Sequence, residues 1–165
     1  MPFTPFHFGP GIVAKACAPH RFWLSTFVAA NVLIDLEVLY YLHHGEAPVH
    51  RYLHTYIGGV AMGLVAAFGM FAVTVLLIRC LSVDSRWMQE QRSVPKGKLL
   101  RESMFAGLLG GVSHVLLDSL MHHDMNPLWP FAQGNALAGT IEVGTLHGAL
   151  GLTGFFGVIL WLFLR

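Results

Sequence analysis

Charge is scarce in this chain. Only 12% of its 165 residues are charged, 55% are hydrophobic, and the mean hydropathy is +0.59. A soluble domain carries about 25% charged residues, so this chain has too little polar surface to cover a core in water. The composition excludes an ordinary soluble domain and predicts a single membrane-embedded domain over residues 1–165.

Other common signals are missing as well. Cys17 and Cys80 are far apart in apolar surroundings, which excludes a disulfide framework and leaves them as expected packing residues. The net charge of +1 gives no indication of nucleic-acid binding. The apolar run after Arg21 continues into Asp35 and Glu37 without a convincing cleavage site, so we expect a retained helix in place of a signal peptide.

What the chain does contain is four apolar stretches of bilayer-crossing length. Residues 56–78 have no ionisable group and would extend about 34 Å as a helix, which we expect to run from near Tyr52 to near Leu81. Residues 143–164 are nearly as apolar, whereas polar groups at helical spacing interrupt residues 22–42 and 99–122. The sequence therefore predicts an all-α polytopic bundle of four transmembrane helices.

Basic residues gather around the link between the second and third stretches: Arg79, Arg86, Arg92, Lys96, Lys98 and Arg101. Residues 123–138 contain neither lysine nor arginine. The positive-inside rule then places residues 82–98 in the cytoplasm, as a partly helical loop broken at Pro95, and the turns at 43–48 and 123–135 outside. The basic loop could instead bind a partner or anionic lipid.

Glycines recur in the second and fourth stretches, and every third residue is glycine from Gly148 to Gly157. Small residues let helices approach closely in lipid. These faces predict close packing within the bundle, but they would also suit a homo-oligomer, and the sequence does not separate the two.

Most of the polar side chains would lie at one depth, in the outer half of the membrane. They are Asn31, Asp35 and Glu37, then His50 and His54, then His114, Asp118 and His122, and finally Glu142 and His147. A carboxylate within a bilayer costs a few kcal/mol. A divalent cation would compensate, because imidazole and carboxylate are its natural ligands. The layer therefore predicts a metal site.

Spacing narrows the set of ligands. His50 and His54 are four residues apart, as are His114 and Asp118, so each pair would share one face of a helix. Asp35 and Glu37 are about 200° apart on an ideal helix and can serve one site only if the helix is distorted or ends there. The alternative is a set of structural hydrogen bonds, with Asp118 paired to histidines of its own helix. We expect His20, His43, His44 and His123 to be interfacial or loop residues, and the roles of His122, Glu142 and His147 stay open.

Five stretches, taken in order over residues 1–130, resemble the motifs of the predicted membrane-bound metal-dependent hydrolases. This is a bacterial and archaeal inner-membrane family whose best-known member is under SOS control. The stretches are "MPFTPFH" with His7, "NVLIDLE" with Asp35 and Glu37, "HRYLHT" with His50 and His54, "GVSHVLLD" with His114 and Asp118, and "PLWP" with Trp129 and Pro130. Glu37 stands where the family has a second aspartate, and His122 where it often has proline. The resemblance implies a relation to zinc-dependent phospholipase C.

The resemblance adds His7 to the ligands and thereby tests the topology. A cytoplasmic start would leave His7 a bilayer away from the other ligands. We therefore expect residues 9–19 to form a short half-helix that descends from the outer site to a turn near Arg21, after a break at Gly9, Pro10 and Gly11. Irregular backbone is tolerated at membrane depth where it is buried in protein.

These observations together predict a metal-dependent hydrolase that acts on a lipid or lipid-linked ester, preferably a phosphoester. It would act at the outer side of a bacterial or archaeal cytoplasmic membrane. One or two divalent ions would bind there, with Zn²⁺ as the preferred ion. Their ligands would be His7, Asp35, Glu37, His50, His54, His114 and Asp118. So many ligands favour a two-metal cluster bridged by Asp35. The catalytic candidates are Asp118, Glu37 as ligand or general base, and Arg51, which would clamp an anionic headgroup or simply anchor the helix.

The sequence leaves three alternative functions open. A metal transporter would use the same ligands, but one polar layer leaves no inward half of a pathway. A haem-binding bundle is disfavoured because Asp118 accompanies His114. A structural membrane protein with a metal staple would share the whole ligand set and lack only the activity.

Overall fold

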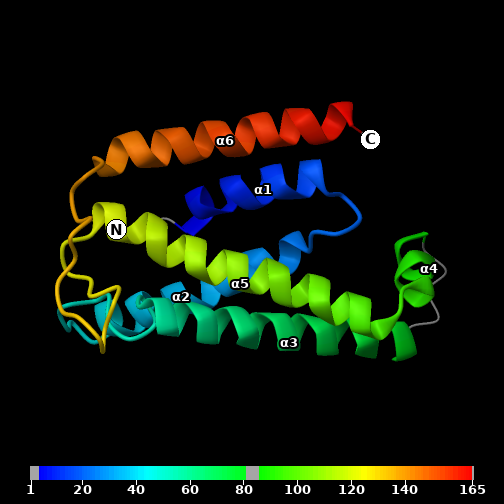
Figure 1. Cartoon of the computed structure of the whole chain (residues 1–165), viewed down its shortest axis with the longest axis horizontal. Coiled ribbons are helices and arrows are strands. Elements are labelled where there is room, and N and C mark those ends of the chain that lie inside the picture. Colours follow the sequence, from blue (N-terminus) through cyan, green and yellow to red (C-terminus); the bar gives the residue numbers. More distant parts are fainter. Residues whose placement is uncertain (1–3, 81–85, 165) are drawn as a thin grey trace.

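The computed structural model describes residues 4–80 and 86–164, and every regular element in these residues is a helix (Figure 1). In chain order the elements are the 3₁₀ helix η1 (Thr4–His7), α1 (Phe8–Cys17), α2 (Leu24–His43), α3 (Tyr56–Cys80), α4 (Arg86–Ser93), α5 (Lys96–Met121) and α6 (Val143–Phe163). The helices α2, α3, α5 and α6 are long and apolar enough to cross a membrane. This confirms the predicted bundle of four such helices preceded by a short N-terminal helix.

The second predicted span begins later than expected. Residues 50–54 form an irregular loop, and α3 starts at Tyr56. Thr55 caps the helix, since its Oγ1 accepts a hydrogen bond from the backbone N–H of Gly58 (2.9 Å). His50 and His54 therefore lie before the helix, and the prediction that they share a helical face is wrong.

Glycines set the contact between α3 and α5. A Cβ atom on Gly63 would lie 2.5 Å from the carbonyl oxygen of Gly107, and one on Gly59 would lie 2.7 Å from that of Gly111. Only residues without a side chain allow two backbones to approach so closely. The glycine pairs hold α5 against α3 along the half of α5 that leads to His114.

α1 packs alongside α6 and does not cross the bundle (Figure 1). A Cβ atom on Gly157 would touch Val13 at 3.0 Å, whereas no described atom lies within 4 Å of one on Gly148. The predicted glycine face of the last span thus packs within the chain at Gly157 and is open at Gly148. The outer side of α6 carries Phe155 and Phe156, which are 60% and 61% exposed, as suits a helix that faces lipid.

Candidate metal centre

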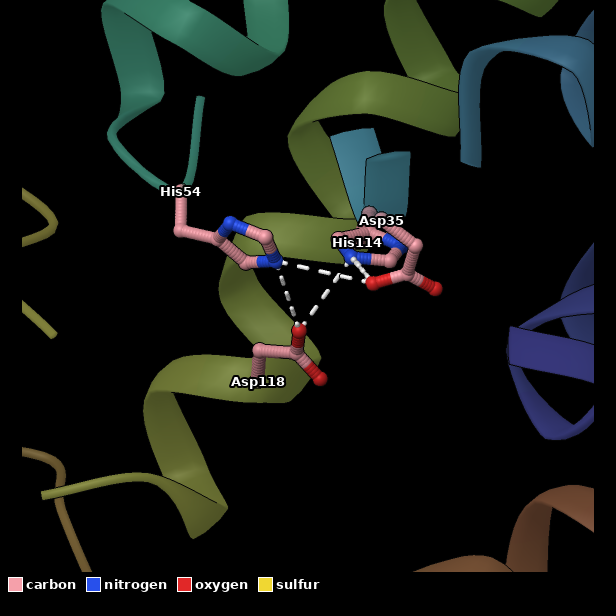
Figure 2. Close-up of side chains that lie close together, drawn as sticks. All are labelled: Asp35, His54, His114 and Asp118. Carbon is pink, nitrogen blue, oxygen red and sulfur yellow. Dashed lines mark ion pairs between the residues drawn. The ribbon is translucent and has the colours of Figure 1, made fainter. Parts of the chain in front are cut away.

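Four buried side chains from separate parts of the chain converge on one point (Figure 2). Asp35 comes from α2, His54 from the loop before α3, and His114 and Asp118 from α5. One nitrogen or oxygen of each lies within 4.8 Å of the corresponding atoms of the others. The structure thus brings together residues that are up to 83 positions apart in the sequence (118 minus 35).

The distances between these atoms suit a shared ion. Nε2 of His114 lies 3.3 Å from Oδ1 of Asp35 and 3.2 Å from Oδ2 of Asp118. Nε2 of His54 lies 3.6 Å and 3.5 Å from the same two oxygens. Donor atoms that each stand about 2.0–2.1 Å from a tetrahedral zinc ion lie about 3.3–3.4 Å from one another. These four nitrogen–oxygen distances of 3.2 to 3.6 Å are therefore close to the spacing of ligands around one zinc ion.

A second layer of polar groups orients both rings. Nδ1–H of His54 donates to Oε2 of Glu37 (3.0 Å), and Nδ1–H of His114 donates to Oδ1 of Asn31 (3.0 Å). The amide of Asn31 is fixed in turn, because its Nδ2 donates to the carbonyl of Phe27 (2.8 Å). With the proton on Nδ1, each ring presents the lone pair of Nε2, and neither Nε2 atom has a hydrogen-bond partner among the described residues.

His7 joins the cluster from the N-terminal side. Its Nε2 atom lies 3.0 Å from Oδ1 of Asp118, its side chain is fully buried, and its ring stacks on that of His114 at 4.6 Å. The element η1 brings His7 to this position, and α1 then leads away beside α6. The position of His7 is the one that the expected half-helix requires.

A second group shares one member with the first. His50, Asp118 and His122 also place ligand atoms within 4.8 Å of one another. The rings of His50 and His122 stack at 4.2 Å, and Nδ1–H of His50 donates to both carboxylate oxygens of Asp124, at 2.8 and 2.9 Å. Asp118 belongs to both groups and Asp35 only to the first, so Asp118 is the residue that the two groups share, and bridging by Asp35 stays a prediction.

The two histidines of this second group are kept neutral. Burial and the nearby His50 ring lower the pKa of His122 to about 4. Burial and the neighbouring His54 lower the pKa of His50, and they outweigh the opposing effect of Asp124. A ligand histidine must be neutral, so both rings are ready to bind a cation at pH 7.

Glu37 lies outside both groups. Its carboxylate accepts backbone N–H bonds from Arg51 (3.1 Å), Tyr52 (2.7 Å) and Leu53 (3.0 Å) in addition to the bond from His54. Both oxygens are thus occupied on the far side of the His54 ring. The structure thus gives Glu37 a positioning role in place of the expected role as ligand or general base. Because only Asp35 of the two acids belongs to the cluster, α2 needs no distortion.

The side chain of Arg51 also points elsewhere. Its Nη2 atom pairs with Oε2 of Glu46 (2.9 Å), its Nε donates to the carbonyl of Pro48 (2.8 Å), and its guanidinium lies 3.7 Å above the ring of Tyr41. These contacts anchor the loop and correspond to the anchoring alternative. They leave the guanidinium unavailable as a headgroup clamp at the cluster in this arrangement.

The remaining candidates lie around the centre. Trp129 packs edge-on against Tyr52 at 5.6 Å, and His147 stacks on Phe6 at 4.6 Å. Glu142 is exposed just before α6, and His20, His43, His44 and His123 are exposed and belong to neither group. Sequence reasoning missed Asp124 and the role of Asn31. It left His122 open, although His122 continues the four-residue spacing of His114 and Asp118.

Comparison with known proteins identifies a family. A family model described as "Domain of unknown function (DUF4184)" matches residues 1–165. No curated protein and no solved structure matches the chain. The resemblance to the membrane-bound metal-dependent hydrolases therefore stays a prediction.

Proposed function

The chain belongs to the DUF4184 family, a domain of unknown function, over its whole length, and from the geometry of the cluster we propose that it is a membrane-embedded metal-dependent hydrolase. Its substrate would be a lipid or lipid-linked phosphoester, and its cofactor one or two divalent ions, best Zn²⁺. It would reside in a bacterial or archaeal cytoplasmic membrane with the cluster towards the outer side, because the basic residues lie at the opposite end of the bundle.

One observation carries the proposal. His54 and His114 each have a proton fixed on Nδ1 by an acceptor behind the ring, and each aims a bare Nε2 at the carboxylates of Asp35 and Asp118. The Nε2 atoms of both histidines and the carboxylate oxygens of Asp118 are buried and form no hydrogen bond within the described chain. A cation bound between the two rings and the two carboxylates would compensate for their burial.

The residues divide the chemical work between them. Asp35, His54, His114 and Asp118 would hold the first ion, and His50 and His122 would extend the centre from the shared Asp118. When bound, zinc would acidify a water molecule and stabilise charge on a phosphoryl oxygen. Oδ1 of Asp118, which lies 3.0 Å from Nε2 of His7, would accept the proton of an attacking water.

The location of the cluster supports a lipid-derived substrate. Asp35, His114 and Asp118 are buried within helices of membrane-spanning length, so a substrate that reaches them would lie against the apolar surroundings of the bundle. A phosphoester is the preferred linkage, because a centre with several carboxylate and imidazole ligands suits in-line displacement at phosphorus.

The test compares purified full-length protein with the Asp118→Asn variant in phospholipid vesicles. We expect wild-type protein to contain zinc and to hydrolyse a lipid phosphoester, with loss of activity on chelation and recovery when zinc returns. Asp118→Asn should remain helical by circular dichroism and lose turnover. If metal-loaded, folded wild-type protein leaves every lipid ester in native membranes unchanged, the hydrolase proposal fails and a structural metal staple explains the cluster.

A further inference from the structure

A groove of about 760 Å³ lies between α1 and α5, away from the metal centre. Its walls are apolar and include Phe22, Phe105 and Leu109. Phe105 is 61% exposed and Leu109 39% exposed, and both lie on the membrane-length helix α5. Phe105, Leu109 and His114 follow one another along α5, so the groove runs from the start of that helix towards the membrane interior.

Cations line one end of this groove: Arg21 after α1, and Lys98 and Arg101 in the first turns of α5. All three are exposed. Nζ of Lys98 stands 3.9 Å from Oε1 of Glu102, which also lines the groove, whereas neither guanidinium forms an ion pair with any described residue. The end of the groove therefore has two guanidinium groups in excess over carboxylate.

We propose that this groove is a binding site for an anionic glycerophospholipid. The headgroup phosphate lies between Arg21 and Arg101, and an acyl chain lies along Phe105 and Leu109. Arginine offers paired N–H donors that match phosphate oxygens, and basic recesses between membrane helices are suited to acidic headgroups. The apolar wall that continues from the cations along α5 matches an amphiphile, whereas a free anion would use only the cationic end.

The two cysteines provide a direct assay. Cys17 lines the groove and Cys80, at the end of α3, does not, and both are free and exposed on the protein surface, contrary to their expected packing role. A lipid in the groove covers Cys17 and leaves Cys80 reactive. The ratio of the two maleimide-labelling rates in one detergent-solubilised sample therefore reports occupancy, with Cys80 as the internal reference.

We expect phosphatidylglycerol to slow labelling of Cys17 at least about threefold relative to Cys80, and phosphatidylcholine to have no such effect. The double variant Arg21→Gln/Arg101→Gln should lose this protection. The matched control Arg79→Gln/Lys96→Gln removes two cations near the same end of the bundle, neither of which lines the groove, and should keep it.

Three results would overturn the proposal: equal protection by both lipids, protection that persists in the groove variant, or equal protection by inorganic phosphate alone. If the groove variant fails to fold, the wild-type comparison of the two lipids and inorganic phosphate still decides. The assay involves neither metal nor hydrolysis, so its outcome is independent of the proposed function.

Discussion

The Nδ1 atom of His54 lies 3.0 Å from Oε2 of Glu37, and the same carboxylate accepts the backbone N–H groups of the three residues that precede His54. One side chain on α2 therefore sets both the orientation of the ring and the path of the loop that carries it. Because α3 begins only at Tyr56, no helix holds His54 in place. The position of its ring therefore depends on the carboxylate of Glu37.

We predict that Glu37→Gln weakens zinc binding by about 10- to 100-fold, the usual effect of removing a group that orients a metal ligand. The amide would present N–H groups where the loop already supplies donors. The matched control is Glu46→Gln, which changes an exposed acid that pairs with Arg51. Competition against a zinc-binding dye measures both affinities, and equal values for the two variants would contradict the role assigned to Glu37.

The ligand set predicts how metal stabilises the fold. Adding zinc to metal-free wild-type protein should raise its unfolding free energy by about 2.7 kcal/mol when free zinc is 100-fold above Kd. His114→Ala should lose most of this gain, whereas His20→Ala, which changes an exposed histidine outside both groups, should keep it. Thermal unfolding in detergent with and without chelator gives the comparison. The same gain in both variants would exclude His114 as a ligand.

His122 predicts an acid dependence of the metal-free protein. Its pKa is about 4 in the folded chain and 6.5 ordinarily. Between pH 4 and pH 6.5 the unfolded chain therefore binds a proton at His122 that the folded chain does not bind. Stability is therefore lost as the pH falls from 6.5 towards 4. His122→Asn should reduce this loss, as measured by denaturation at several pH values. Parallel curves for the variant and the wild type would refute the assignment.

The contact between α3 and α5 predicts opposite outcomes for two glycines of one helix. Gly63→Ala would place a methyl group against the carbonyl oxygen of Gly107 and should cost about 1–3 kcal/mol. The methyl group of Gly69→Ala meets no atom of the described residues within 4 Å, so this variant should be neutral or more stable by up to about 1 kcal/mol. Thermal unfolding of both variants checks the pair, and equal stability would mean that α3 and α5 pack differently.

Orientation is testable in cells that express a variant lacking Cys17 and Cys80. A cysteine in place of Phe131, which is 87% exposed, should react with a membrane-impermeant maleimide from outside. A cysteine in place of Lys96 should react only after the membrane is permeabilised. The reverse pattern would place the metal centre on the cytoplasmic side and exclude an external substrate.

The parts of the fold that depend on composition could be predicted from the sequence. Apolar runs of bilayer length located α2, α3, α5 and α6 to within a few residues, because length and hydropathy are local properties. The shared face of His114 and Asp118 is local too. Spacing alone could not reveal that His50 and His54 lie in a loop, since a carboxylate from another helix holds that loop in place.

The partners of the ligands were harder to find. Asp124 binds His50 across 74 positions, and Asn31 binds His114 across 83. Such contacts depend on how the helices pack, which no pattern within one segment records. The same holds for Asp118, whose membership of both groups follows from the approach of the 50–54 loop and the end of α5.

The pairing of α1 with α6 gives the molecule two packing units, since α2, α3 and α5 contact one another while α6 rests mainly on α1 (Figure 1). His7 precedes α1, whereas Asp118 belongs to the other unit, so the junction between the units passes through the centre. An ion coordinated from both sides would bind most tightly when the units are closed together. The affinity for the ion and the separation of the two units are then thermodynamically linked. A lipid that moves the two units apart would lower the affinity for the ion.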